Sequence, residues 1–243
     1  MRLSRRDFVT TSLAGVAGLV ARVSPSQTRT PEDGYRLWLR YAPPGEAAEQ
    51  YRRAISQIVV QGQSRTAQVT REELVSAVAS LLEKPIPADT QGLRRGAVVV
   101  GTPANSPLIE SLRWQTDLVK LGPEGYVIRT GIVAGEPVLA VASEGEIGAL
   151  YGAFHFLRLM QAGAPLDRLQ IAERPRVQLR MLNHWDNMDG SIERGYAGRS
   201  LWQWDKLPGT IDARYIDYAR ANASIGINGA VPNSVNADAR VLT

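Results

Sequence analysis

The chain has 243 residues, of which 44% are hydrophobic and 21% charged, an ordinary balance for a globular protein long enough for one domain and the start of another. It has no Cys and only two His, which excludes disulfides and thiolate metal sites and argues against a catalytic zinc site. The net charge of +4 comes from scattered Arg interleaved with acids, so it does not indicate a nucleic-acid partner.

The N-terminal residues predict a removable export signal. Ser4-Arg5-Arg6-Asp7-Phe8 is a twin-arginine pattern, and an apolar run to about Ala21 follows it. That run is too short and too mildly hydrophobic for a comfortable membrane span. We therefore assign 1–30 to a twin-arginine signal peptide and linker. We expect a periplasmic or secreted protein with no membrane partner after signal removal.

A small, non-catalytic α/β domain with helices on one sheet is predicted over 31–172. Alternating apolar and Arg residues predict a half-buried strand at Tyr35–Tyr41, and a helix is predicted over about 44–60. Thr70 and Glu73 have the spacing of a capping box, which predicts the start of a helix that ends near residue 83. The other predicted elements are strand Ala97–Val100, helix Asn105–Arg113, strands Tyr126–Thr130 and Val138–Ala142, and a helix from Ser143 to about Gln161.

Two features of this domain could suggest a ligand and do not. The segment Gly101–Asn105 follows a strand, but it lacks the glycine spacing of a phosphate-binding loop, so we interpret it as a plain turn. His155 lies among aromatic residues in a predicted helix, and a core or surface histidine is the better interpretation than a metal ligand.

The remaining residues, 173–243, predict one strand–helix–strand unit. Strand Val177–Leu182, helix Asp212–Ser224 and strand Ile227–Val231 have the order of a βα unit with a parallel partner strand. This is the repeating unit of a (β/α)8 TIM barrel, in which active sites lie at the carboxyl ends of the strands. The chain contains only the first such unit and a second strand, so the barrel is incomplete.

The segment that runs from the end of the first of these strands into the loop before the helix is the most informative one. Arg180–Asp205 combines three Trp with carboxylates, amides and Arg in a turn-rich stretch. Aromatic faces stack on the apolar face of a sugar ring, while polar side chains bond its hydroxyls and any carboxylate. On composition alone, an ordered loop anchored by its aromatic residues is an equal alternative.

Specific strings in this region resemble the family 67 glycoside hydrolases, the α-glucuronidases. These strings are RPRVQLRMLNHWDN, DGSIERGYAGRSLWQWD, IDARYIDYARANASIGINGAV and NSVNA; upstream, GYRLWLRY and EGEIGALYGAFHFLR resemble the N-terminal domain of that family. The resemblance implies an enzyme that acts in xylan degradation on glucuronic-acid-substituted xylo-oligosaccharides. It would hydrolyse the α-1,2 bond between (4-O-methyl)glucuronic acid and xylose, with inversion and without a cofactor.

The resemblance also places candidate substrate-binding residues. Trp185, in the NHWDN string, matches a tryptophan that flanks the bound glucuronic acid in the family. Glu193 and Arg194 belong to the matching ERGYAGRS loop, and Asn233 and Asn236 belong to the Asn-rich end of the second strand. The sequence departs from our expectation for the family at one neighbouring position, where Pro232 replaces an aliphatic residue and puts the geometry of that loop in doubt.

Several neighbouring residues have a structural interpretation instead. Turn formation is the preferred role for Asp186, Asn187 and Asp189, and loop anchoring is preferred for Trp202 and Trp204.

The family carries its catalytic acid and base on later barrel strands, so no catalytic residue is assigned within this chain. We expect a truncated portion of an α-glucuronidase that is inactive alone; a homodimer of the full-length protein is left open. Two alternatives stay open at this point. One is a non-catalytic carbohydrate-binding or scaffold protein built on the N-terminal domain, and the other is a different barrel hydrolase with the same front end.

Overall fold

The computed structural model describes residues 33–88 and 92–234, so the predicted twin-arginine signal lies outside the described residues. The chain divides at Leu37 into a short N-terminal unit and a second unit, Trp38–Thr243, which contains every strand and α-helix described below. In the first unit, the Leu37 N–H donates to the Gly34 carbonyl and closes a turn.

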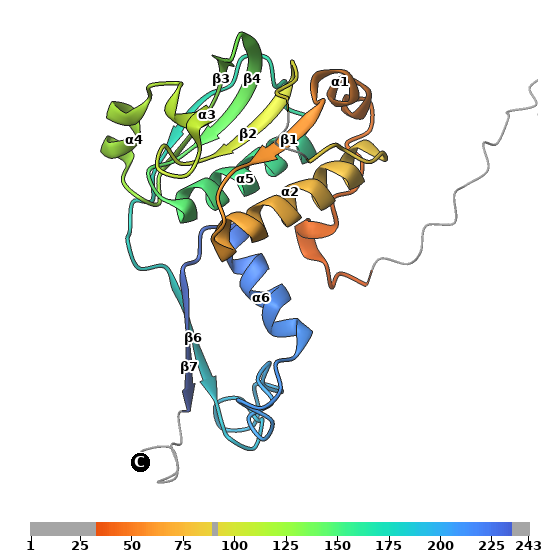
Figure 1. The fold of residues 1–243 in the computed structure, drawn as a ribbon. Coiled ribbons are helices and arrows are strands. Elements are labelled where there is room, and N and C mark those ends of the chain that lie inside the picture. Colours follow the sequence, from red (N-terminus) through yellow and green to blue (C-terminus); the bar gives the residue numbers. More distant parts are fainter. Residues whose placement is uncertain (1–32, 89–91, 235–243) are drawn as a thin grey trace, which may run out of the picture. The chain divides into compact units, whose positions relative to one another are not determined.

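A five-stranded mixed sheet forms the centre of the N-terminal α/β part (Figure 1). Strands β1, β2 and β4 are parallel, and β3 runs antiparallel to both β4 and β5. Their order in the sheet is β1 (Gln57–Val60), β2 (Ala97–Gly101), β4 (Glu136–Ala142), β3 (Tyr126–Val133) and β5 (Gln170–Glu173). Every residue of β1 and β2 is buried, as expected for strands covered on both faces.

Helices cover both faces of this sheet. Alternate strand residues such as Ile58 and Val98 pack against α2 (Arg65–Leu82) and α5 (Glu146–Gln161), which lie side by side on one face (Figure 1). The intervening residues, such as Val59 and Val99, pack with Ile109 and Leu118 from the short helices α3 (Pro107–Glu110) and α4 (Gln115–Leu121). The expected α/β domain is therefore present, with two separate apolar layers.

The predicted strand at Tyr35–Tyr41 is wrong. Residues Leu37–Arg40 form the 3-10 turn η1, and Leu37 and Tyr41 have φ values of 51° and 48°. These left-handed backbone conformations do not occur within a strand. The alternation of apolar residues reflects a change in burial along the turn, because Leu39 and Tyr41 are buried whereas Tyr35 and Leu37 are exposed.

The predicted helix over 44–60 is also wrong in its second half. Helix α1 covers only Ala47–Ala54, and Ile55 is already extended, with φ −104° and ψ 118°. Residues Gln57–Val60 form the edge strand β1. A short apolar run has no periodicity that distinguishes a strand from a buried helix. These residues form a strand because they pair with β2.

The capping box at Thr70 is wrong, because α2 begins further toward the N-terminus. The Ser64 hydroxyl accepts the Ala67 N–H at 3.0 Å and caps the helix. Thr70 lies inside the helix, where its hydroxyl donates to the Thr66 carbonyl at 2.8 Å.

Other predicted elements are confirmed with shifted ends. Strands β2, β3 and β4 and helix α5 are present, although Gly145, and not Ser143, is the N-cap residue of α5. The predicted helix Asn105–Arg113 is reduced to the single turn α3, and α4 and β5 were not predicted.

The remaining unit is β6 (Met181–Asp186), α6 (Ala213–Ser224) and β7 (Gly229–Ser234). The predicted parallel pairing of its two strands is confirmed. Both strands lie further along the chain than predicted. The Arg180 side chain donates to the Val177, Gln178 and Gly226 carbonyls, which engages the backbone before β6 in local contacts instead of a strand ladder.

Candidate functional site

The carboxyl ends of β6 and β7 bring two of the predicted site residues together. Trp185 is the in-register partner of Asn233, and both lie near the ends of their parallel strands. Because side chains alternate along a strand, Trp185 lies on one face of the ribbon and its neighbours His184 and Asp186 lie on the other. Burial follows this alternation: Trp185 is 48% exposed, whereas Asp186 is 1% exposed.

The loop after β6 folds back onto Trp185. The Glu193 N–H donates to the Trp185 carbonyl at 2.7 Å, and the Asn187 side chain donates to the Glu193 carbonyl at the same distance. Glu193 has a left-handed φ of 56°, which reverses the chain at this point. The loop therefore places Glu193 beside the strand end, with the exposed Arg194 next to it.

The carboxylate of Glu193 has a further neighbour. Its hydrogen bond raises the pKa of the exposed Tyr196 hydroxyl, because ionising the tyrosine would put a second negative charge beside it. This corner of the loop thus presents a carboxylate and a phenol to solvent.

Asn187 and Asp189 form turns, as predicted. The Asn187 N–H donates to the Ser191 carbonyl, and the Asp189 carboxylate accepts both the Ser191 N–H and its hydroxyl. Those two bonds lower the pKa of Asp189. Asp186 departs from the turn prediction, because it is the last residue of β6 and its side chain is buried.

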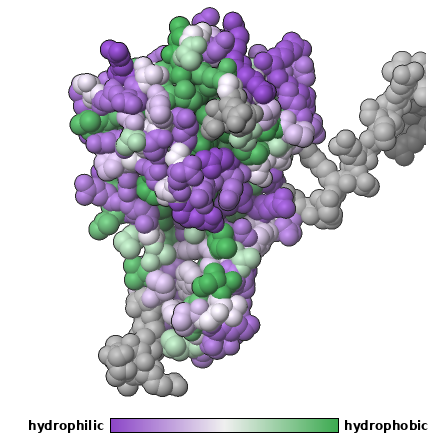
Figure 2. All heavy atoms as spheres, viewed as in Figure 1, coloured by the Kyte–Doolittle hydropathy of each residue, from purple (hydrophilic) through white to green (hydrophobic). Residues whose placement is uncertain are grey.

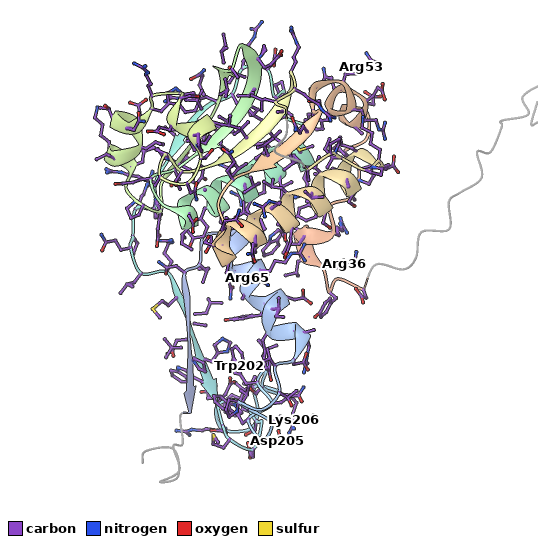
Figure 3. The ribbon with its side chains drawn as sticks, in the orientation of Figure 1. Arg36, Arg53, Arg65, Trp202, Asp205 and Lys206 are labelled. Atoms are coloured by element: carbon purple, nitrogen blue, oxygen red, sulfur yellow. The ribbon has the colours of Figure 1, made fainter. Side chains whose placement is uncertain are left out.

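A cluster of four aromatic rings lies on the buried face of β6, between the strand and α6. Trp202 packs against Tyr215, Tyr218 and His184, with ring centroids 4.8 to 5.7 Å apart. Trp202 lies among the side chains next to β6, whereas Asp205 and Lys206 lie toward the outer end of the loop (Figure 3). Trp202 thus anchors the loop, as predicted.

Two hydrogen bonds add to this anchor. The Gln203 N–H donates to the Tyr215 hydroxyl at 2.7 Å, and the Gln203 side chain donates to Asp212, the N-cap residue of α6. Tyr215, Tyr218 and His184 were not predicted as members of this cluster. Their only sequence signal is the three-residue spacing of the tyrosines on one helix face.

The other predicted site residues have different outcomes. Strand β7 continues through Pro232, which pairs with His184, so the ladder persists at this position. Asn236 lies outside the described residues.

Among residues 33–88 and 92–234, no group of three or more His, Asp or Glu is arranged to hold a metal ion, and no helix is long and apolar enough to cross a membrane.

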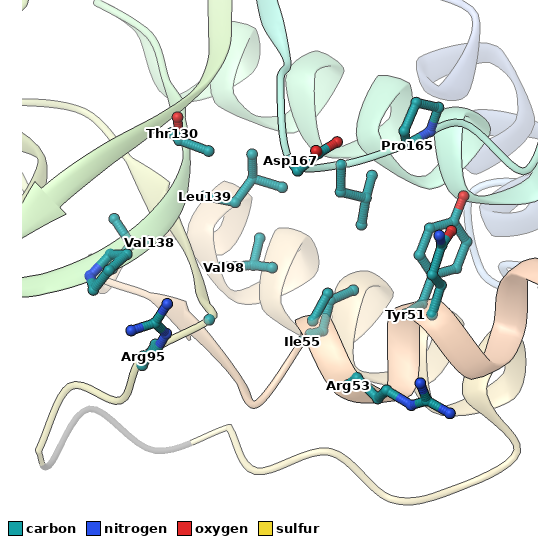
Figure 4. Close-up of a pocket in the computed structure, with 15 residues that line it drawn as sticks. Tyr51, Arg53, Ile55, Arg95, Val98, Thr130, Val138, Leu139, Pro165 and Asp167 are labelled. Atoms are coloured by element: carbon teal, nitrogen blue, oxygen red, sulfur yellow. The ribbon is translucent and has the colours of Figure 1, made fainter.

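A cavity of about 750 Å³ lies elsewhere, in the five-stranded part (Figure 4). Its walls are mostly aliphatic, with Ile55, Val98 and Leu139 among them, and Arg53 and Arg95 lie at its edge. None of its lining residues belongs to the loop after β6. The cavity is therefore separate from the candidate sugar site.

Comparison with known proteins identifies the family. The "Glycosyl hydrolase family 67 N-terminus" domain matches residues 37–156, and the "Glycosyl hydrolase family 67 middle domain" matches residues 159–243. The chain belongs to glycoside hydrolase family 67. Family 67 membership explains the strings around Trp185.

Named relatives agree with this family 67 assignment. The chain is 34% identical over 218 residues to the probable alpha-glucuronidase A of Aspergillus oryzae, covering 87% of this chain and 25% of that protein. It is 32% identical over 249 residues to the alpha-glucuronidase A of Emericella nidulans, covering 98% of this chain and 27% of that protein. The chain thus spans about a quarter of the length of these curated relatives.

A solved structure shares the fold. A family GH115 4-O-methyl-α-glucuronidase with specificity for decorated arabinogalactans superposes with a TM-score of 0.52 at 15% sequence identity. The match covers 72% of the family 67 chain and 25% of the other chain.

Proposed function

We propose that the chain supplies the first sugar-binding strand end of an α-glucuronidase. In this proposal, the enzyme hydrolyses the α-1,2 bond between (4-O-methyl)glucuronic acid and xylose in xylo-oligosaccharides, with inversion and without a cofactor. Supporting it are the relatives named alpha-glucuronidase A and the polar, aromatic surface around Trp185.

The strand–helix–strand unit has the geometry that a catalytic (β/α)8 barrel would need. If β6 and β7 are its first two strands, the face carrying Met181, Asn183 and Trp185 points to the barrel interior, and the face carrying His184 points to α6. Trp185 would then stand at the end of the barrel where substrates bind. The Glu193 and Arg194 side chains would lie at the rim of the same site.

An inverting glycosidase needs two carboxyl groups with different roles. One carboxylic acid protonates the leaving oxygen while a carboxylate, about 6.5–9.5 Å away, activates water. We propose that both groups belong to later barrel strands outside this chain, so this chain alone does not hydrolyse the bond. Trp185 would contribute the apolar platform that holds the uronic acid ring in place for that reaction.

The observation that carries this proposal is the half-exposed indole of Trp185 at a strand end whose other face is buried. In an enzyme that contains this chain and a complete catalytic domain, Trp185→Ala should remove a stacking surface of roughly 1–3 kcal/mol. The value of kcat/KM on an aldobiuronic acid should fall by about tenfold to a hundredfold. The melting temperature should change little because the ring is already half exposed in the folded chain.

A Trp202→Leu variant is the matched control, because Trp202 anchors the loop from the buried side. It should lower the melting temperature, and its folded fraction should keep a larger share of the activity than Trp185→Ala. Normal kinetics with reduced stability in Trp185→Ala would contradict the site assignment.

We also propose that the protein is exported through the twin-arginine route, supported by the Ser4–Phe8 pattern. Replacing Arg5 and Arg6 together with Lys should retain the protein in the cytoplasm of a host with that pathway. Cell fractionation measures this, and a Lys84→Arg variant controls for a general change in basic residues. Unchanged export of the double variant would show that the general secretory route recognises the leader.

A further inference from the structure

We propose that Tyr218 is a positioning residue for the sugar site: through His184, its hydroxyl holds the end of β6 and so sets the orientation of the Trp185 indole. This inference rests on the proposed function for its consequence in catalysis. Its structural part depends only on contacts among the described residues.

His184 and Asp186 flank Trp185 and point to the opposite face of the ribbon. Fixing both flanking side chains restricts the backbone torsions of the residue between them. The orientation of a half-exposed ring can therefore be controlled from the buried face, on the side of the ribbon opposite the indole.

Helix α6 contacts His184 through Tyr218. The Tyr218 hydroxyl lies 2.7 Å from His184 Nε2, and the two rings meet edge to face with centroids 5.5 Å apart. Trp202 also meets the imidazole edge to face, with ring centroids 5.5 Å apart, and it contacts Tyr218 as well. His184 is thus in contact with rings from both the helix and the loop, and Tyr218 provides its polar contact with α6.

Asp186, the other residue that flanks Trp185, is buried. Its side chain is 2% exposed, and its Oδ2 atom has no hydrogen-bond partner among the residues that the structure describes. A buried carboxylate oxygen without a donor is costly. His184 Nδ1 lies 3.7 Å from this oxygen, outside hydrogen-bond distance but close enough for an attractive interaction with an N–H dipole.

These contacts favour one of the two ring nitrogens as the site of the proton when the His184 imidazole is neutral. If the Tyr218 hydroxyl donates to Nε2, the ring proton lies on Nδ1 and faces the Asp186 carboxylate. The opposite tautomer would leave both Nδ1 and Asp186 Oδ2 as acceptors facing each other. We therefore expect the Nδ1–H tautomer, held by the tyrosine.

A second histidine with a tyrosine partner allows a comparison within the same chain. His155 is the only other histidine in the sequence, and its Nδ1 atom lies 2.9 Å from the Tyr126 hydroxyl. The same donation from tyrosine would put the proton of His155 on Nε2. One nitrogen spectrum should then show two histidines with opposite tautomers.

The experiment uses the 243-residue chain labelled with ¹⁵N-histidine and 5-fluorotryptophan, at a pH where both imidazoles are neutral. His155→Gln and Trp185→Phe variants assign the His184 and Trp185 signals. In Tyr218→Phe, which keeps the aromatic ring, the His184 Nε2 resonance should shift because this atom loses its donor, while Nδ1–H still faces the Asp186 carboxylate. The Trp185 fluorine resonance should shift or broaden, while far-UV circular dichroism stays unchanged.

Two controls separate positioning from general loosening. Tyr126→Phe removes the equivalent hydroxyl beside His155 and should leave the Trp185 resonance in place. Tyr215→Phe removes the contact with the Gln203 N–H, so it should alter the Trp202 resonance more than that of Trp185. An unchanged Trp185 resonance in Tyr218→Phe, or an equal change in Tyr126→Phe, would overturn the proposal.

The consequence for catalysis is read in an enzyme that contains the complete catalytic domain. There, Tyr218→Phe should lower kcat/KM on an aldobiuronic acid by about threefold to tenfold, with a melting temperature close to wild type. Unchanged kinetics beside an altered Trp185 resonance would overturn the positioning role. Absence of any α-glucuronidase activity in the wild type would overturn the proposed function, and the fluorine spectra would still test whether Tyr218 influences the Trp185 indole.

Discussion

At the scale of single residues, Glu73 joins three parts of the chain. Its carboxylate accepts two hydrogen bonds from the Arg220 guanidinium, at 2.6 and 2.9 Å, and one from the Tyr41 hydroxyl at 2.5 Å. Glu73 is 7% exposed, and the burial of Tyr41 together with this carboxylate raises the tyrosine pKa well above its usual range. A buried carboxylate on α2 thus holds both α6 and the chain after η1.

Glu73→Gln should therefore destabilise the fold. Breaking a buried pair leaves the other charge without compensation, at a cost of about 3–5 kcal/mol. The Arg220 side chain is 33% exposed and can recover some hydration, so we expect a loss of about 2 kcal/mol in the free energy of unfolding.

Urea denaturation measures this loss, and Glu72→Gln on the same helix is the control, because Glu72 is exposed and 4.0 Å from its Arg65 partner. Equal stability of the two variants would show that the Glu73 cluster contributes nothing net.

At the scale of elements, the start of α2 depends on one hydroxyl. Ser64 accepts the Ala67 N–H and donates to the Glu146 carboxylate at 2.5 Å in the first turn of α5. Glu146 also accepts from the Asn105 side chain at 2.7 Å. A single cap residue therefore ties the starts of the two long helices that cover one face of the sheet.

Ser64→Ala should cost about 1–2 kcal/mol of stability, because it removes the cap of α2 and one hydrogen bond to a charged group. Thermal unfolding measures the change. Ser76→Ala is the matched control, since Ser76 is exposed in the middle of α2, where Ala is the better helix former. A stability loss in Ser76→Ala as large as that in Ser64→Ala would refute the capping role.

At the scale of the whole molecule, the two sheets differ in how they are covered. The five-stranded sheet is packed on both faces, whereas the β6–β7 ribbon leaves one face open, with Met181 46% and Val231 41% exposed. Both residues lie on the same face as Trp185. Apolar surface of the β6, α6 and β7 unit is visible in Figure 2. In the proposed barrel this face would line the interior.

The open face should bind apolar dyes. We expect the double variant Met181→Gln, Val231→Thr to reduce anilinonaphthalene sulfonate fluorescence by at least about half, because it interrupts a contiguous apolar patch. The unfolding transition should not move, since neither side chain is buried. Ile132→Thr, an isolated residue that is 71% exposed, is the control and should leave the fluorescence unchanged. Equal dye binding by all three proteins would show that this face is not an accessible apolar surface.

The sequence by itself determined the elements whose pattern is local. Strands β2 and β4 are short apolar runs, helix α5 repeats its apolar residues with helical spacing, and α6 has Asp212 at its N-cap and Gly226 after its end. The family was determined in the same way, because long strings of matching residues around Trp185 need no structure to be recognised. The sequence placed Trp185 in the loop three residues beyond strand Val177–Leu182, whereas the structure has it as the penultimate residue of β6.

Only the tertiary structure decided the features that depend on partners distant in the chain. Residues Gln57–Val60 form a strand because β2 lies beside them. Thr70 lies inside a helix and not at its start, because Ser64 is the N-cap residue. Glu73 has the spacing of a cap residue, but a bidentate contact with Arg220, 147 residues away, decided its role. Likewise, His184 and Tyr218 are 34 residues apart and meet only when α6 packs back onto β6. The local sequence pattern predicts which face of an element is buried. Which group contacts each buried polar atom depends instead on how the elements pack together.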